Sequence, residues 1–142
     1  MSLSQSRSAP SLEPGSFRDW DSRVFYDDGR VLRALSDEGL ADWLALSESK
    51  LFTEAVAEGK LVRTRAAEDS IDGAAAVLEH ERIPFVSYPY EWTFAMLRDA
   101  ALLQLELLRR ALDEDLILKD SSSYNVQWRG AKPVFIDVGS FE

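Results

Sequence analysis

Three oxygen-bearing side chains late in the chain, Asp120, Asn125 and Asp137, have the types and spacing that suit a chemical task. They lie in the stretch LKDSSSYNVQWRGAKPVFIDVGSFE, residues 118–142. Phosphoryl transfer depends mostly on positioning and on stabilising charge. One carboxylate orients the acceptor hydroxyl, while an amide oxygen and a second carboxylate hold Mg²⁺ against the phosphates. Asp, Asn and Asp are the right types for these tasks, because Mg²⁺ prefers hard oxygen ligands and binds few protein groups.

A β-hairpin is the element expected to bring two of these side chains together. Its strands are predicted at 126–128 and 134–136, on either side of a turn at 129–132. The return strand carries Asp137 back toward Asn125, so their oxygens can share one ion.

A long helix is predicted over residues 93–115, ahead of the hairpin, because apolar residues recur at intervals of three and four. They form two stripes, Phe94, Leu97, Ala101, Leu105, Leu108 and Leu112 in the first, and Met96, Ala100, Leu103 and Leu107 in the second. A helix that is apolar on two sides is usually central to its domain.

The first ninety residues predict a mixed α and β arrangement. Residues 1–16 are rich in Ser, Pro and Gly and are expected to be disordered. The expected elements that follow are a hairpin about Asp28-Gly29, a helix capped by Ser36, a break at 47–49, a second helix ending at Gly59, a short strand at 60–64, a polar loop at 65–73, a strand or short helix running into a strand at 74–83, and an extended segment at 85–92. One α+β domain is predicted for 17–142, with a possible boundary near 92.

The composition argues against several classes of partner and several kinds of site. The net charge is −9, which argues against nucleic acid or an anionic membrane. The chain has no cysteine and one histidine, so disulfides, thiolate metal sites and histidine clusters are excluded. No apolar run approaches the roughly 18 residues that span a bilayer, and a cytoplasmic location is expected.

Simpler interpretations stand beside the chemical ones. Asp120 can cap the Ser-rich turn that follows it, and Asn125 can brace that turn. The single His80 is expected to be a half-exposed strand residue. The aromatic residues Phe85, Tyr88, Tyr90 and Trp92 could line a nucleotide pocket, although packing in the core is favoured.

The order of long helix, D-x-x-x-x-N turn, hairpin and aspartate resembles the protein-kinase-like fold, including its aminoglycoside-phosphotransferase branch. KDSSSYN stands where kinases have their catalytic loop, and FIDVG stands where they have a metal-binding aspartate. The resemblance implies an N-lobe followed by part of a C-lobe. It implies Asp120 as the catalytic base, Asn125 and Asp137 as Mg²⁺ ligands, and ATP as the cofactor. Arg33 and Lys119 are the candidate cofactor-binding cations.

Several features depart from the kinase pattern. Lys119 replaces the Arg or Gly that precedes the catalytic aspartate, and no glycine-rich phosphate loop precedes the first hairpin. Arg33 stands in place of the usual lysine, and its planar fork reaches phosphate differently. Glu54 is a weak candidate for its acidic partner. The chain stops at Glu142, and the remaining C-lobe helices are expected to be missing.

Residues 23–142 also resemble the N-terminal region of large bacterial proteins described as class I SAM-dependent methyltransferases, some of them NoeA-like nodulation proteins. The stretches VLEHERIPFVSYPYEW and LKDSSSYNVQWRGAKPVFIDVGSFE carry this resemblance. It implies that SAM would be used only by a domain further along. The leading hypothesis is a kinase-like module that is non-catalytic or weakly binds Mg²⁺-nucleotide. The alternatives are a phosphotransferase acting on a small hydroxyl acceptor, and an interaction domain that forms a homodimer.

Overall fold

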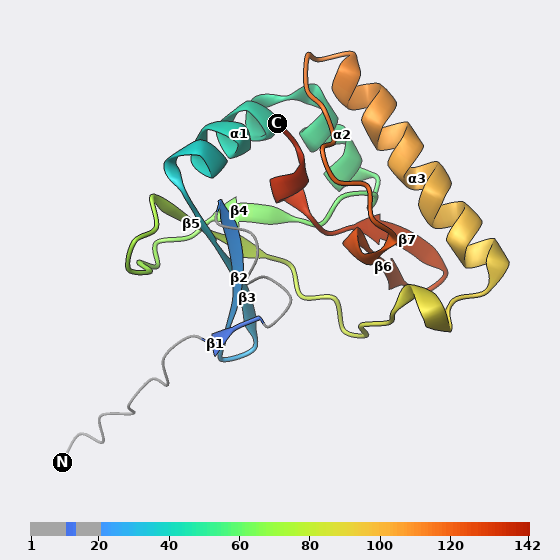
Figure 1. Ribbon diagram of the computed structural model, residues 1–142, viewed down its shortest axis with the longest axis horizontal. Helices are drawn as coiled ribbons and strands as arrows, with labels where there is room; N and C mark the ends of the chain where they lie inside the picture. Colours follow the sequence, from blue (N-terminus) through green and yellow to red (C-terminus); the bar gives the residue numbers. More distant parts are fainter. Residues whose placement is uncertain (1–10, 14–20) are drawn as a thin grey trace.

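A computed structural model describes residues 11–13 and 21–142. It confirms a mixed α and β domain, with an antiparallel sheet, three α-helices and a separate hairpin (Figure 1). The elements have the bounds β1 Ser11–Leu12, β2 Ser22–Asp27, β3 Arg30–Leu35, α1 Asp37–Glu48, α2 Lys50–Ala57, β4 Thr64–Ala66, β5 Ala76–His80, η2 Pro89–Glu91, α3 Phe94–Leu112, η3 Ser123–Asn125, β6 Val126–Arg129, β7 Lys132–Phe135 and η4 Val138–Ser140.

The larger sheet has the strand order β1-β2-β3-β5-β4, and every neighbouring pair is antiparallel. Its central hairpin turns at Asp28 and Gly29, both with positive φ (45° and 80°). Two such residues form the turn that matches strand twist, so the predicted Asp-Gly hairpin is confirmed. Residues 1–10 and 14–16 of the predicted tail lie outside the described part, whereas Ser11–Leu12 pairs with β2 as a short strand.

Serine side chains set the start of both helices that follow the hairpin. Ser36 Oγ accepts the amide hydrogen of Gly39 at 3.0 Å, as the N-cap prediction requires. Ser49 ends α1 and also caps α2, where its Oγ accepts from Phe52 N at 3.0 Å. The break predicted at 47–49 is therefore confirmed as a single shared cap residue.

A carboxylate from the far end of α3 completes the cap of α2. Glu114 accepts from Lys50 N at 2.9 Å and from Leu51 N at 2.6 Å. Because the first amides of a helix have no partner within it, this contact fixes α2 against α3. The contact joins residues more than sixty positions apart, so no local pattern in the sequence indicates it.

The stretch predicted as a strand at 60–64 has a different role. Only Thr64 belongs to a strand of the larger sheet, β4, which continues to Ala66 into the predicted loop. Leu61 forms an isolated parallel bridge with Phe135, and Val62 N donates to Phe135 O at 2.9 Å. This segment therefore joins the sheet region to the terminal hairpin. The open alternative at 74–83 is settled as strand β5.

Helix α3 lies along one side of the hairpin β6–β7, which in Figure 1 stands between α3 and the larger sheet. The two predicted stripes have different fates. The second faces the core through Ala100, Leu103 and Leu107, whereas most of the first is exposed. One buried apolar cluster contains Leu35 and Leu78 as well as Leu107 and Phe141, so it spans both sides of residue 92. Among the described residues, no helix is both long and apolar enough to cross a membrane.

Candidate functional site

The best-defined polar centre surrounds Arg33, which is buried in the middle of the larger sheet. Its strand, β3, has β2 on one side and β5 on the other, and the Arg33 side chain is 7% exposed, so the guanidinium has little access to water. Arg33 Nη1 lies 2.8 Å from Asp137 Oδ1 and donates to Ser22 Oγ at 2.5 Å. A buried charge needs such partners, because desolvation without them costs several kcal/mol. Asp137 thereby ties the terminal segment to the sheet.

His80 holds the other side of the same guanidinium. Arg33 Nε donates to His80 Nε2 at 3.0 Å, so this nitrogen is an acceptor. His80 Nδ1 lies 2.8 Å from Thr64 Oγ1, whose own hydrogen goes to Val62 O. The bonds are consistent with a neutral ring that carries its hydrogen on Nδ1. Burial, and then the charge of Arg33, hold the pKa of His80 well below its usual range.

The half-exposed position predicted for His80 is wrong, because the residue is 7% exposed. It pairs with Val31 of β3 on one side and with Thr64 of β4 on the other. The alternation of polar and apolar residues in β5 suggested an open face. That pattern does not reveal that a neighbouring strand supplies a polar partner.

The terminal segment connects its polar residues through Ser140. Ser140 Oγ donates to Asp137 Oδ2 at 2.6 Å. Asn125 Nδ2 lies 3.5 Å from Ser140 Oγ, a long contact, and donates to the backbone oxygen of Asp120 at 3.3 Å. The structure therefore places Asp120, Asn125 and Asp137 along one short chain of contacts that leads to Arg33.

A glycine allows the terminal turn to approach the sheet this closely. A Cβ added to Gly139 would lie 2.5 Å from Ser22 Oγ and 2.9 Å from Arg33 Nη1. Such distances leave no room for a side chain. Ser22, Gly139 and Ser140 were missed by sequence reasoning, although a glycine and a serine two and three residues after the candidate Asp137 were a usable signal.

The side chains of Asp120 and Lys119 contact other groups at the edge of this buried centre. Asp120 is exposed, and its Oδ1 accepts from Ser122 N at 2.9 Å, the local turn contact that was one of its two interpretations. Lys119 Nζ lies 3.3 Å from Glu142 and 3.8 Å from Asp42. Its backbone amide donates to Ser140 O at 2.8 Å, so the main chain here is fixed beside the terminal turn.

The acidic partner of Arg33 is Asp137 and not Glu54. Glu54 lies on α2 and approaches Lys50 at 3.5 Å. The separation of Arg33 and Asp137 along the chain hid this pair from a search for local patterns. Both carboxylate oxygens of Asp137 are engaged, one by Arg33 and one by Ser140.

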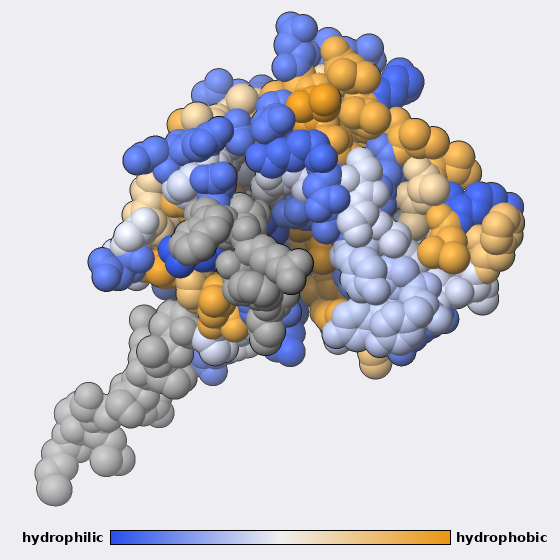
Figure 2. Space-filling view, in the orientation of Figure 1, coloured by the Kyte–Doolittle hydropathy of each residue, from blue (hydrophilic) through white to orange (hydrophobic). Residues whose placement is uncertain are grey.

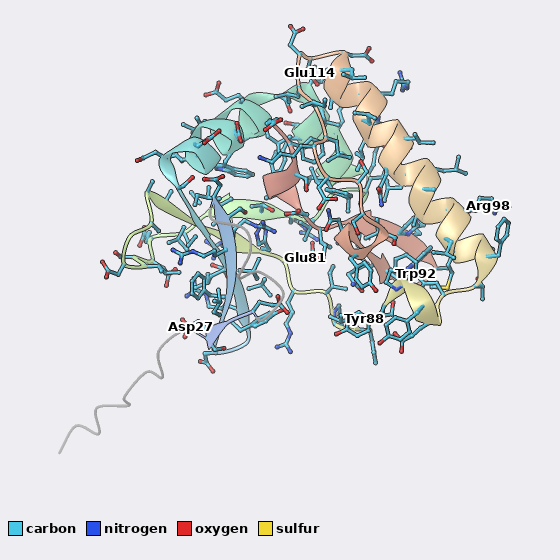
Figure 3. The ribbon with its side chains drawn as sticks, viewed as in Figure 1. Asp27, Glu81, Tyr88, Trp92, Arg98 and Glu114 are labelled. Carbon is cyan, nitrogen blue, oxygen red and sulfur yellow. The ribbon has the colours of Figure 1, made fainter. Side chains whose placement is uncertain are left out.

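The linker between β5 and α3 is fixed to the terminal hairpin. Gln127 accepts from Ser87 N at 2.9 Å and donates to Ser87 O at 3.0 Å. Trp92, labelled in Figure 3, donates to Ser87 Oγ at 2.9 Å and packs edge-on against Trp128 with ring centroids 5.5 Å apart. Of the four aromatic residues favoured for the core, only Trp92 is buried. Phe85, Tyr88 and Tyr90 are exposed, and the rings of the two tyrosines stack at 5.6 Å.

The space next to the site is small. A cavity of about 10 Å³ lies between the sheet and the terminal turn, with Ser22, Asp42, Lys119 and Gly139 in its lining. That volume suits about one water molecule. Within the described part of the chain, no group of three or more His, Cys, Asp or Glu side chains is placed to hold a metal. A larger ligand would therefore approach from the exposed side, where Asp120 and Asn125 lie.

No model of a known protein family matches the chain. The chain is similar to the nodulation protein NoeA of Rhizobium meliloti (strain 1021), with 38% identity over 133 residues, which cover 90% of this chain. It spans 28% of the length of that relative. The similarity supports a NoeA-like relation for nearly the whole domain.

Proposed function

We propose that the domain is a kinase-like module that binds Mg²⁺-nucleotide weakly and does not transfer phosphate itself. We propose further that it acts within a longer NoeA-like protein, where SAM-dependent methyl transfer would belong to residues outside this chain. The observation that carries the binding proposal is the 2.8 Å contact between Arg33 and Asp137. It joins a buried cation to a candidate metal ligand, and Ser140 links that ligand to Asn125.

The donor set fits Mg²⁺ chemically. Asp137 and Asn125 offer hard oxygen atoms, which Mg²⁺ prefers. A carboxylate has about four lone-pair positions, so the two hydrogen bonds of Asp137 leave acceptor capacity for an ion. Asn125 uses its Nδ2 in the two contacts described, so its Oδ1 is the atom that would bind the ion. Asn125 and Asp137 would hold the ion, and Mg²⁺ would supply charge stabilisation for the phosphates.

The order of elements supports the kinase-like part of the proposal. An antiparallel sheet carries Arg33 on its central strand, and a long helix is followed by the turn with Asp120 and Asn125. A hairpin then returns the chain to Asp137. This arrangement matches the order that the sequence resemblance implied.

Other contacts favour binding over transfer. The carboxylate of Asp120 is used by its own turn, at Ser122 N. Lys119 Nζ lies near two carboxylates and not beside Arg33. The charge of Asp137 is already balanced by a buried guanidinium. Phosphate transfer to a small hydroxyl acceptor is the alternative, favoured by the position of Asp120 next to Asn125.

Calorimetric titration of the full chain with ATP, with and without Mg²⁺, tests the binding proposal. We expect ATP to bind only when Mg²⁺ is present. The Asn125→Ala variant should bind ATP at least tenfold more weakly, a loss of about 1.4 kcal/mol of binding free energy. In Asp137→Asn, Mg²⁺ should no longer change the affinity for ATP. Circular dichroism checks that this variant is folded. Asp72→Ala, in an exposed turn far along the chain from the candidate ligands, is the matched control. Absence of ATP binding to the wild-type chain would refute the proposal.

Transfer is tested separately with radiolabelled ATP and a panel of small hydroxyl compounds. We expect no labelled product above background. Product that disappears in Asp120→Asn would support the phosphotransferase alternative, with Asp120 as its base.

A further inference from the structure

The outward side of α3 carries an apolar stripe that no other described residue covers. Its exposed members, with their exposed fractions, are Phe94 (83%), Leu97 (39%), Leu102 (57%), Leu105 (63%) and Leu112 (58%), and Ile117 (46%) extends it beyond the helix. Figure 2 shows apolar surface along the edge of the molecule where α3 runs. A different face of the same helix packs in the core through Ala100, Leu103 and Leu107.

A stripe of this length is unusual on a protein that works alone. Nineteen helical residues extend about 28 Å. Soluble monomers rarely expose continuous apolar patches above a few hundred Å², and larger ones mark interaction sites. The spacing of Leu97, Ala101 and Leu105 at four residues is that of a helix face which receives another helix.

We propose that this stripe is the contact surface of a homodimer, in which two copies of α3 pack antiparallel about a two-fold axis at Leu105. Residues equally far before and after Leu105 then face each other. Leu102 meets Leu108 of the second copy, three residues to either side. Phe94, eleven residues before the axis, lies at the level of position 116 of the second copy, where Leu116 is buried and the adjacent Ile117 is exposed. This inference does not depend on nucleotide binding.

Charge selects the antiparallel orientation. Arg98 lies seven residues before Leu105 and Asp113 lies eight after it, and their side chains are 60% and 68% exposed. The antiparallel pair therefore sets Arg98 of each copy at the level of Asp113 of the other. A parallel pair would set Arg98 against Arg98 and Arg109 against Arg109, and like charges at one level repel.

The existing contacts of these side chains leave the intermolecular pair available. Arg98 lies 2.9 Å from Asp99, and Arg109 approaches Asp113 at 3.5 Å within one helix turn. A carboxylate accepts several hydrogen bonds, so Asp113 can receive Arg98 of the second copy in addition. Arg109 would lie opposite Ala101, a small residue that leaves room for the arginine stem.

One helix pair makes a small interface. Standard specific interfaces bury about 800 Å² on each partner, and smaller ones are weak. We therefore expect a concentration-dependent dimer with a dissociation constant on the order of 10–100 μM.

Sedimentation velocity of the full chain, from about 1 μM to about 1 mM, tests the dimer across the range that this weak affinity requires. We expect the wild-type chain to shift from monomer to dimer. Leu105→Glu should remain monomeric, because it places two carboxylates on the symmetry axis. Leu44→Glu, which alters an exposed leucine of α1, should dimerise like the wild type. Circular dichroism confirms that all variants are folded.

Charge reversal tests the orientation. Arg98→Asp and Asp113→Arg should each weaken the dimer about tenfold or more, and the double variant should restore it. A wild-type chain that is monomeric at every concentration would overturn the proposal and leave the stripe to another part of a longer protein or to a different partner. A dimer that survives Leu105→Glu, or a double variant that is not restored, would overturn it as well.

Discussion

The two ends of the polar chain from His80 to Asp120 contrast in their access to water. At the sheet end, Arg33 and His80 are buried and every hydrogen bond fixes a buried group. At the other end, Asp120 is exposed and Asn125 is half-buried. Asp137 lies between them: it contacts Arg33 directly and is linked to Asn125 through Ser140. The buried end is therefore expected to control stability, and the exposed end is expected to control ligand binding.

The largest effect should come from the buried end. Arg33→Ala removes the cation and leaves Asp137 without its partner, and it removes the hydrogen bond to His80. Breaking a buried pair in this way costs about 3–5 kcal/mol of the free energy of unfolding. Urea unfolding followed by circular dichroism measures it. A loss below about 1 kcal/mol would mean that the pair is not a structural contact.

The close approach at Gly139 should have the next largest effect. Gly139→Ala places a methyl group against Ser22 Oγ and is expected to cost about 1–3 kcal/mol, because a packed region resists added volume. Ser22→Ala removes the closest atom. The double variant should therefore lose less stability than the sum of the two single changes, and a double-mutant cycle of unfolding free energies detects this.

The buried His80 should make the free energy of unfolding depend on pH. Its pKa is lowered in the folded chain, so the unfolded chain binds the proton more readily as pH falls below about 6.5. Stability contributed by the neutral ring should be present above that pH and be lost below it. Unfolding measured at pH 7.5 and 5.5 should show a loss in the wild type that His80→Gln does not share. Since His80 is the single histidine, its NMR titration identifies the group directly.

The smallest effect on stability should come from the exposed end. Asp120→Ala removes one hydrogen bond to Ser122 N, which is worth about 0.5–1 kcal/mol at most in water. Thermal unfolding of Asp120→Ala and of Arg33→Ala compares the two losses of stability. An effect as large as that of Arg33→Ala would contradict the division of the site into a structural end and a binding end.

Local signals in the sequence predicted much of the fold. Asp28-Gly29 fixes a tight hairpin because both positions need positive φ, and Ser36 and Ser49 supply the oxygen that helix starts require. These features act over two or three residues. They can therefore be predicted from the sequence without knowledge of contacts between distant residues.

The remaining features depend on contacts between distant segments. Arg33 was a candidate cation, but its partner Asp137 is separated from it by most of the chain. The burial of His80 depends on strand β4, which the polar sequence at 65–73 had hidden. The two stripes of α3 look alike in the sequence, and only the packing of the hairpin decides which faces the core.

The pairing of residues 60–62 with Phe135 has a consequence for synthesis of the chain. Leu61, Val62 and Phe135 are all buried together, yet Phe135 is translated more than seventy residues after Leu61. During elongation, Leu61 and Val62 would remain in water until the late hairpin leaves the ribosome. A nascent chain at that stage is a substrate for chaperones, because exposed apolar segments aggregate. We expect ribosome-bound chains to gain resistance to proteases only after Phe135 has emerged.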